Sequence, residues 1–211
     1  TLRSYSHEKK IIKGKSSYVI NEVNKPIKIN IFGKHNLQNI AGSKVVCEQL
    51  GIKEKDFYNA ISSYELPENR LNMIYNKKFK VFRDFAHSPS KLSSTIEAVK
   101  SFHSKKLLVI YELHSSSSFN KTFLRTYKDS TINSDDSIVY LSDKIVKEKK
   151  YKKPSNDDMH NYFNTKKIIY VNKLKKLLSI LSRKKYDNYH KLFMSSGNFD
   201  GINLKEIYKW L

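Results

Sequence analysis

Apolar positions in the first third of the chain change their spacing at Gly33. Before it, apolar and polar residues alternate in the segments KSSYVINEV and KPIKINIF around a Pro-containing turn, which predicts two antiparallel strands. After it, apolar residues recur at helical spacing as far as Gly51, which predicts a helix that ends at that glycine. A shorter helix is expected over residues 55–64. The apolar positions of the first helix are Leu37, Ile40, Val45 and Leu50.

From Leu71 onward, short β-rich runs alternate with helical segments. This alternation predicts β-α-β crossovers and a mainly parallel sheet, so the expected fold class is α/β. We expect a Rossmann-like domain over residues 67–211, preceded by a hairpin and helices over residues 1–66. The expected strands are 71–76, 79–84, 106–111, 137–141, 167–171 and 190–194, and the expected helices are 89–102, 121–129, 155–163, 173–184 and 204–211.

Polar residues follow the predicted strands at the positions where such sheets bind ligands, just beyond the carboxyl ends. These positions are 84–87, 112–118, 142–143 and 195–201. In the stretch VFRDFAHSPSKL, Asp84 can accept hydrogen bonds from ligand hydroxyls. Ser88 and Pro89 suit the N-cap and first position of a helix. Two interpretations stay open, a ligand site at Asp84 and His87 or simple capping of that helix by His87 and Ser88.

The charge balance first suggests a nucleic-acid partner. The formal net charge is +20 and the isoelectric point is near 9.8, which favours polyanions. However, only five of the 40 basic residues are arginine, the side chain preferred for bidentate recognition, and the lysines are spread along the chain. Together with abundant Ile, Asn, Tyr and Ser, this pattern indicates an AT-rich genome. We therefore expect no nucleic-acid partner, and a basic polyanion-binding module remains the alternative of another class. The lysine-rich segment 147–153 is expected to be a solvated, mobile loop.

Several other classes of protein and site are disfavoured by the sequence. It has no apolar run of membrane-spanning length and no signal-peptide core at its start, so we expect a cytoplasmic protein without a membrane partner. The single cysteine, Cys47, excludes an internal disulfide and a cysteine-based metal cluster, and it is expected to be buried. Gly14-Lys15-Ser16 does not complete a phosphate-binding P-loop, because position 9 is Lys9 instead of glycine.

Several short motifs occur in a fixed order along the chain. They are Gly33-x-His35-Asn36-x-x-Asn39, then Arg70, then DFAHSPSKL from Asp84, then Glu112-Leu113-His114 through Phe119-Asn120-Lys121, and finally MSSGNFDGI from Met194. Together they resemble the Mur ligases, the ATP-dependent acid-amino acid ligases (EC 6.3.2 type) of peptidoglycan synthesis. Within that family the motifs are most similar to the murein peptide ligases, which act in peptidoglycan recycling. The ligases that join L-alanine to UDP-N-acetylmuramate are the alternative.

This resemblance implies a nucleotide site with ATP as the cofactor. The two amides would surround adenine with the nearby histidine, the aspartate would bind the ribose hydroxyls, and a second histidine would lie beside the nucleotide. The arginine would face the phosphates and is the one implied catalytic residue. These positions are Asn36 and Asn39 with His35, then Asp84, His87 and Arg70.

The resemblance also implies the substrates, UDP-N-acetylmuramate and the murein tripeptide L-alanyl-γ-D-glutamyl-meso-diaminopimelate. Loops of the C-terminal domain would face the peptide amine through His114, Ser116, Asn120, Ser195, Ser196 and Asn198. The P-loop, the carboxylate that binds Mg²⁺, the carbamylated lysine and the UDP-binding domain of the family would all lie before Thr1. The chain is therefore expected to be the end of the central ATPase domain plus the C-terminal domain, with no metal ligands of its own. Its partner would be the N-terminal half of the same enzyme, without which it would be inactive.

Overall fold

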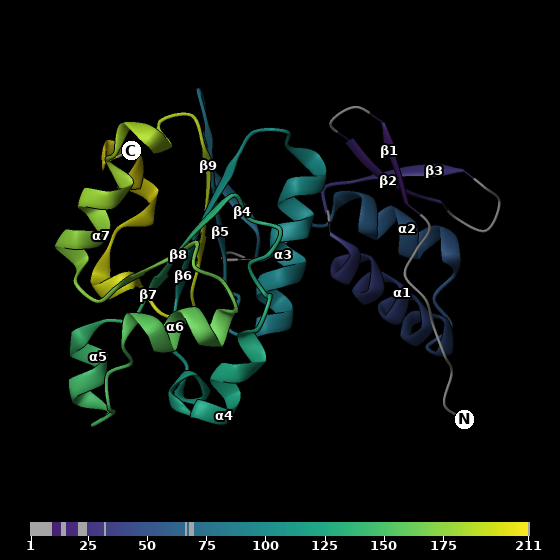
Figure 1. Cartoon of the computed structure of the whole chain (residues 1–211). Helices are drawn as coiled ribbons and strands as arrows, with labels where there is room; N and C mark the ends of the chain where they lie inside the picture. Colours follow the sequence, from purple (N-terminus) through teal and green to yellow (C-terminus); the bar gives the residue numbers. More distant parts are fainter. Residues whose placement is uncertain are drawn as a thin grey trace. The chain divides into compact units, whose positions relative to one another are not determined.

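The computed structural model describes residues 10–13, 16–20, 25–31, 33–65, 67 and 70–210. The chain divides into two compact units, Thr1–Pro67 and Glu68–Leu211 (Figure 1). Gly14 and Lys15 of the incomplete P-loop pattern lie outside the described residues.

The first unit combines a three-stranded antiparallel sheet with two helices. The strands, in the order β1-β2-β3, are β1 (Lys10–Lys13), β2 (Ser16–Ile20) and β3 (Pro26–Ile29), and the helices are α1 (Lys34–Gln49) and α2 (Glu54–Ser63). The sequence predicted β2, β3 and both helices but not β1. Cys47 is half-buried against the small core of this unit. The core residues are Val19, Ile29, Ile31, Leu37, Ile40, Phe57 and Tyr58.

The second unit is built on a six-stranded sheet in the order β4-β5-β9-β6-β7-β8. Only the pairing of β4 with β5 is antiparallel, and the other pairings are parallel, which confirms the predicted mainly parallel α/β fold. Each predicted strand is present within one or two residues of its expected bounds. The strands are β4 (Asn72–Asn76), β5 (Lys80–Asp84), β6 (Leu107–Glu112), β7 (Asp136–Tyr140), β8 (Ile168–Val171) and β9 (His190–Met194).

Helices cover both faces of this sheet. In Figure 1, α3 (Pro89–Phe102) lies on one side of the strands and α7 (Leu174–Leu181) on the other. The central strand β6, with the sequence LLVIYE, is buried along its whole length, as expected for a parallel strand covered on both faces. The α7 face is filled by Leu177, Ile180 and Leu181 packed on apolar side chains of β5 to β9.

Some helices differ from their predicted bounds. The segment expected as one helix over 121–129 is a short α4 (Lys121–Leu124) followed by a 3₁₀ turn (Arg125–Tyr127), and the segment 204–211 is a 3₁₀ helix (Leu204–Trp210). The remaining helices are α5 (Asp143–Glu148) and α6 (Asn156–Phe163). Helix α5 was not predicted, because it is too short to show a helical period. Its start is fixed by the Ser142 hydroxyl, which accepts from the Lys144 N–H.

The lysine-rich segment 147–153 differs from the fully solvated loop expected. Its first two residues end α5, and the Tyr151 ring stacks on the Phe119 ring with centroids 4.2 Å apart. The Lys153 ammonium lies 2.7 Å from the Asp143 carboxylate. The segment therefore has defined partners within the second unit.

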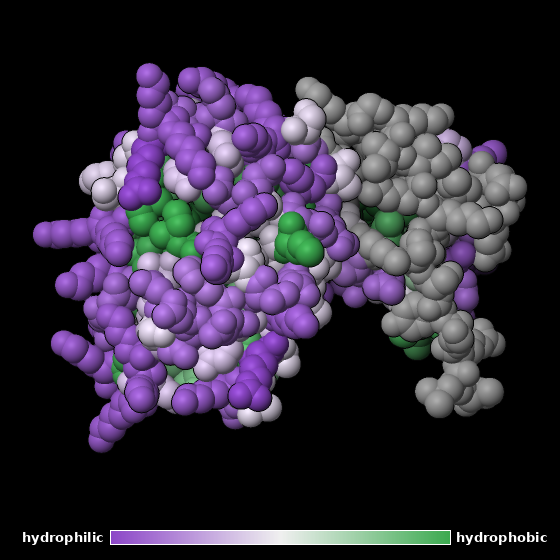
Figure 2. Space-filling model, viewed as in Figure 1, coloured by the Kyte–Doolittle hydropathy of each residue, from purple (hydrophilic) through white to green (hydrophobic). Residues whose placement is uncertain are grey.

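The face of the second unit that is seen in Figure 2 is largely hydrophilic. Figure 2 shows polar side chains spread over the visible face of the second unit, with only small apolar patches between them. Among the described residues, no helix is both long and apolar enough to cross a bilayer.

Candidate functional site at the carboxyl edge of the sheet

The sheet order brings three strand ends together. Strand β9 lies between β5 and β6, and Met194 is in register with both Asp84 and Tyr111. The residues that follow these strands therefore meet at one carboxyl edge. This is the edge where open α/β sheets bind ligands.

Asp84, at the end of β5, is 7% exposed and its carboxylate already has protein partners. The Thr95 hydroxyl, on α3, donates to Oδ2 at 2.6 Å, and the Leu71 N–H donates to Oδ1 at 3.3 Å. Leu71 holds a left-handed backbone conformation, with φ of 50°, that non-glycine residues adopt at a cost. Asp84 thus ties the start of β4 to the first crossover helix.

Glu112, at the end of β6, is a second buried carboxylate and is 2% exposed. Its Oε2 accepts from the Ser195 hydroxyl and, at 3.0 Å, from the Phe199 N–H. Its Oε1 is buried without a hydrogen-bond partner in the described part of the chain. Burial raises the pKa of Glu112, although the hydrogen bonds from Ser195 and Phe199 oppose this shift.

Ser195 joins the strand ends that carry Asp84 and Glu112. Its N–H donates to the backbone carbonyl of Asp84 at 3.1 Å, while its hydroxyl donates to Glu112. The next turn is equally constrained, because a Cβ at Gly197 would overlap the His114 ring and lie 2.9 Å from Glu112 Oε2. Glycine at position 197 therefore allows the loop after β9 to close over β6.

At the end of the same loop, two non-glycine residues have strained backbone conformations. Phe199 and Asp200 both have positive φ, 51° and 57°, and such strain in non-glycine residues gathers at functional sites. The Glu112 carboxylate holds the Phe199 N–H, while Asp200 Oδ2 accepts from the Tyr140 hydroxyl at 2.6 Å and the Ser142 hydroxyl at 2.7 Å. Burial and the Asp200 carboxylate raise the pKa of Tyr140, so this hydroxyl stays a donor.

The exposed side chains next to buried Asp84 are those of Arg70, Phe85 and His87. Arg70 lies over the Phe85 ring at 5.4 Å, and the His87 ring meets the same phenylalanine edge-to-face at 5.6 Å. Ser88 occupies the N-cap position of α3, but its side chain makes no capping hydrogen bond, and His87 contacts the Phe85 carbonyl. Ser88 and Pro89 thus occupy the predicted N-cap and first positions of α3, but neither His87 nor Ser88 supplies a side-chain capping hydrogen bond.

The other predicted substrate residues have mixed surroundings. Asn120 caps α4 by accepting from Thr122 and Phe123, and Asn198 accepts from the Gly201 N–H. Ser116 is exposed and Ser196 is half-buried, both on the carboxyl edge. Ser116 and Ser196 therefore lie at the same edge of the sheet as Asp84 and Glu112.

The three predicted adenine residues lie in the first unit, on α1. Gly33 is the N-cap of this helix, with φ of 96°, so His35, Asn36 and Asn39 belong to its first two turns. Asn36 is half-buried and Asn39 is exposed. The two asparagines are three residues apart and so share a helix face.

The described residues offer no candidate metal site, and some residues of the carboxyl edge were not singled out by the sequence. No group of three or more His, Cys, Asp or Glu side chains among the described residues could hold a metal ion. The sequence did not single out Thr95, and it gave Glu112 and Asp200 only within the polar stretches 112–118 and 195–201 and the motifs that overlap them. A carboxylate that ends an otherwise apolar strand, as in LLVIYE, was the available signal for Glu112.

Comparison with known proteins gives a consistent set of relatives. No protein-family model matches the chain. It is 23% identical over 196 residues, 88% of its length, to the UDP-N-acetylmuramate–L-alanine ligase of Fusobacterium nucleatum, of which it covers 41%. The chain thus spans less than half the length of this curated relative.

Two solved structures, of an alanine ligase and of a murein peptide ligase, share the fold of this chain. The UDP-N-acetylmuramate-alanine ligase of Thermotoga maritima superposes with a TM-score of 0.68 at 18% identity, over 93% of this chain and 43% of that one. The murein peptide ligase of Psychrobacter arcticus gives 0.65 at 18% identity, over 98% of this chain and 44% of that one.

Proposed function

We propose that this chain, a homologue of the Mur ligases, is the C-terminal portion of an ATP-dependent amide ligase acting in the cytoplasm. In this proposal residues 1–66 end the nucleotide-binding domain and residues 67–211 form the C-terminal domain. The proposal rests on the arrangement of side chains at the carboxyl edge of the second unit. There, two buried carboxylates and Ser195 fix the loops that present Arg70, His87 and His114.

The residues around Asp84 fit a nucleotide. Arg70 is exposed and makes only a cation–π contact with Phe85 among the described residues, so its guanidinium is available for phosphate oxygens. A carboxylate has about four acceptor positions, and Thr95 and Leu71 occupy two at Asp84, which leaves capacity for ribose hydroxyls. Separately, in the first unit, Asn36 and Asn39 on α1 are the residues that we propose for contributing amide groups to adenine.

The chemistry would proceed in two steps. A carboxylate oxygen of UDP-N-acetylmuramate attacks the γ-phosphorus of ATP, which releases ADP and leaves an acyl phosphate. The peptide amine then attacks the acyl carbon, and phosphate departs as the amine loses its proton. Arg70 would neutralise charge on the transferred phosphoryl group. Mg²⁺ would supply further neutralisation from ligands outside this chain.

The amine substrate separates two candidate reactions. The motifs MSSGNFDGI and DFAHSPSKL support a murein tripeptide as the amine substrate, and hence a role in peptidoglycan recycling. The alternative is addition of L-alanine, which is the reaction named for the Fusobacterium and Thermotoga relatives.

The test is an assay of the natural gene product that contains this chain. It would be incubated with ATP, Mg²⁺ and UDP-N-acetylmuramate, together with either the tripeptide or L-alanine, and the products identified by mass spectrometry. We expect ADP release and the UDP-muramoyl-tripeptide. Formation of the alanine product alone would identify the alternative, and the absence of any ligated product would refute the proposal.

A further inference from the structure

The amino edge of the six-stranded sheet gathers basic side chains from three loops. These loops precede three neighbouring strands, β5, β9 and β6, and each contains an exposed lysine pair. Residues 76–80, 103–106 and 182–191 together contain nine Lys or Arg residues and one acid, Asp187. We call the exposed basic residues of these loops the basic patch, which consists of Lys77, Lys78, Lys105, Lys106, Arg183, Lys184 and Lys185.

Hydrogen bonds hold the three loops against one another. The Lys105 ammonium donates to the Lys78 carbonyl at 2.6 Å, the His190 N–H donates to the Lys106 carbonyl at 2.8 Å, and the Lys80 N–H donates to the His190 ring at 3.0 Å. Strands β5 and β6 are two strand spacings apart, about 10 Å. Exposed charges act on one another over roughly 10 Å at an ionic strength of about 0.1 M. The lysine pairs therefore produce one continuous positive field.

Acids neutralise little of the basic patch. Within the described residues, Lys185 has a carboxylate partner, Asp136 at 2.8 Å, and the other patch residues have none within ion-pair distance. The buried neighbour His190 has the same positive surroundings. Burial lowers the pKa of His190 to about 4, and the charges that add to this shift include those of His103 and Lys105.

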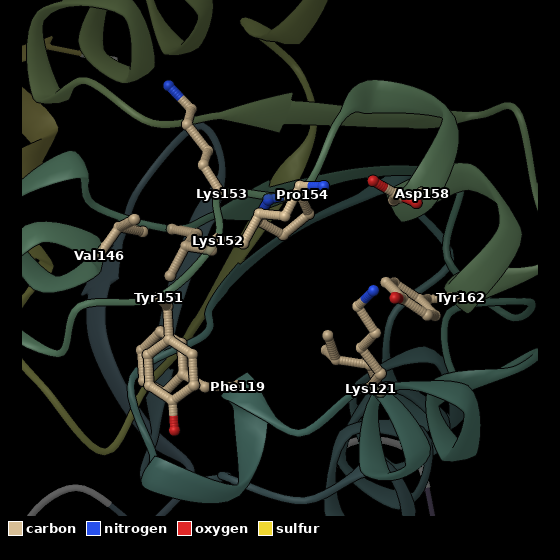
Figure 3. A pocket seen from close by; sticks show the side chains of 11 residues that line it. Phe119, Lys121, Val146, Tyr151, Lys152, Lys153, Pro154, Asp158 and Tyr162 are labelled. Carbon is tan, nitrogen blue, oxygen red and sulfur yellow. The ribbon is translucent and has the colours of Figure 1, made fainter.

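Lysines at the carboxyl edge lie closer to acids. Figure 3 shows Lys121 and Lys152 on the walls of a pocket of about 200 Å³ that Asp158 also lines. Hydrogen bonds from Ser155 lower the pKa of Asp158, and the two lysines lower it further. Although lysine is spread evenly along the sequence, acids thus accompany the lysines of this pocket more than those of the basic patch.

Two exposed aromatic rings of the C-terminal 3₁₀ helix adjoin the basic patch. Tyr208 is 43% exposed and stacks on Tyr75, at the end of β4 that pairs with the start of β5, with ring centroids 5.2 Å apart. Trp210 is 55% exposed, and its carbonyl accepts from the hydroxyl of Ser182, which leads into the loop before β9. Tyrosine and tryptophan are enriched where a bilayer meets water, because their rings combine an apolar body with a polar atom.

We propose that the basic patch, with the rings of Tyr208 and Trp210, docks on the surface of an anionic lipid bilayer. Lysine ammonium groups are point charges, which suits diffuse attraction to lipid headgroups. Bidentate recognition of phosphates and bases favours arginine, and Arg183 is the one arginine of the patch. The side chains therefore fit a lipid surface better than a nucleic acid. The sequence predicted no membrane partner because it lacks a spanning run, but attachment to a surface requires none.

Attachment at the amino edge leaves the candidate functional site open to solvent. The basic patch lies at the opposite ends of the strands from Asp84 and Glu112, and strands of this length span about 17–20 Å. In Figure 1, the C-terminus lies at one end of the sheet, and α4 and α5, which follow β6 and β7, lie at the other. The inference goes beyond the proposed ligase function and does not depend on it, because it uses only groups at the amino edge.

Sedimentation of the chain with lipid vesicles tests the proposal. One set of vesicles contains phosphatidylcholine alone, and the other contains about one part phosphatidylglycerol to two parts phosphatidylcholine. At about 0.1 M salt we expect the anionic vesicles to bind the chain about tenfold more tightly or better, and to release it at about 1 M salt, where charges are screened within about 3 Å. Equal binding to the two sets, or no binding to the anionic set, would overturn the proposal.

Fluorescence reports whether this edge meets the bilayer, because the chain contains a single tryptophan. We expect the emission of Trp210 to move to shorter wavelength with anionic vesicles, and to be quenched when their lipids carry brominated acyl chains. Binding to vesicles without either change would show that another face of the chain attaches, and would refute the assignment of the surface.

Paired substitutions locate the charge. Lys77→Gln with Lys184→Gln removes one lysine from each of two loops and should weaken binding to the anionic vesicles about tenfold or more. The matched control is Lys175→Gln with Lys176→Gln, which removes the same charge from exposed positions of α7 and should change the affinity less than about twofold. Thermal melting confirms that each variant is folded. Equal weakening by both pairs would mean that the net charge of the chain, and not this edge, binds the vesicles.

A uridine oligonucleotide tests nucleic acid as the competing polyanion. We expect the anionic vesicles to sediment the chain even when the oligonucleotide is present at an equal concentration of phosphate groups. Release of the chain from the vesicles by the oligonucleotide, or binding of the oligonucleotide without binding of the vesicles, would identify nucleic acid as the partner and overturn the proposal.

Discussion

The two edges of the six-stranded sheet bury opposite kinds of groups. The carboxyl edge buries the acids Asp84 and Glu112, whereas the amino edge buries the bases His190 and Lys191, at the start of β9. The acids accept hydroxyl and amide donors from loops and helices around them. Lys191 has no hydrogen-bond partner within the described chain, and its ammonium lies 3.6 Å from the centre of the Phe79 ring.

Burial favours the neutral form of the ionisable side chains at both edges, but the two edges differ in their hydrogen bonds. It raises the pKa of Glu112 and lowers the pKa of His190 to about 4 and that of Lys191 to about 8, in each case favouring the neutral form. At the carboxyl edge, hydrogen bonds oppose this effect and fix the loops after the strands. The carboxyl edge thus holds loops in place through its carboxylates, whereas at the amino edge His190 accepts one backbone hydrogen bond, from the Lys80 N–H at 3.0 Å, and Lys191 has no partner within the described chain.

The largest effect is expected at Glu112. Replacing it by alanine leaves the Ser195 hydroxyl and the Phe199 N–H without their acceptor and opens a cavity, so urea unfolding should show a loss of about 3 kcal/mol. Glu112→Gln keeps an acceptor oxygen and should lose about 1 kcal/mol. Equal losses in the two variants would show that the hydrogen bonds to this carboxylate do not hold the loop.

Lys191→Met should stabilise the protein, in contrast to the Glu112 variants. Methionine loses the cation–π contact with Phe79 but removes a buried charge without a hydrogen bond, so the free energy of unfolding should rise by about 2 kcal/mol at pH 7. A lysine pKa of about 8 means that the folded chain binds fewer protons than the unfolded chain from pH 8 to 10.5. The unmodified protein should therefore gain stability across that window, and the methionine variant should not. A destabilised variant would mean that the ammonium has a favourable role.

Thr95→Val should weaken the carboxyl edge more modestly. It removes the hydroxyl that donates to Asp84 but keeps the volume, which should cost about 1.5 kcal/mol in urea unfolding. Thr95→Ser keeps the donor and serves as the control. If valine is tolerated as well as serine, Asp84 does not depend on this bond.

Arg70→Ala should leave stability nearly unchanged, with a loss below about 1 kcal/mol, because the side chain is exposed and its contact with Phe85 is a surface cation–π pair. Its effect should instead be on catalysis, with kcat of the natural gene product falling at least tenfold. Arg70→Lys keeps the charge and should recover part of this loss. An unchanged kcat in the alanine variant would remove Arg70 from the phosphate site.

Much of this fold follows from the sequence, because each strand of the second unit is a short β-rich run followed by polar residues. The polar ends at Asp84 and Ser195 were predicted on this basis, and the structure brings them together. The role of Glu112 could not be predicted, because its partner Ser195 is 83 residues away and reaches it only when β9 inserts between β5 and β6.

The order of the lysine-rich segment 147–153 was missed for a related reason. The composition of this lysine run indicates a solvated loop. Only the stacking of Tyr151 on Phe119 and the ion pair of Lys153 with Asp143 show that the segment is ordered against its neighbours. Contacts between loops that follow different strands leave no periodic signal in the sequence.

Substrate binding at the carboxyl edge can be observed directly by NMR spectroscopy. Amide ¹H–¹⁵N spectra of the chain would be recorded with and without the diaminopimelate tripeptide. We predict shifts at His114, Ser195 and Ser196, and none at Lys80, His190 and Lys191 on the amino edge. Shifts confined to the amino edge, or no shifts at a saturating peptide concentration, would contradict the assignment of the carboxyl edge as the functional site.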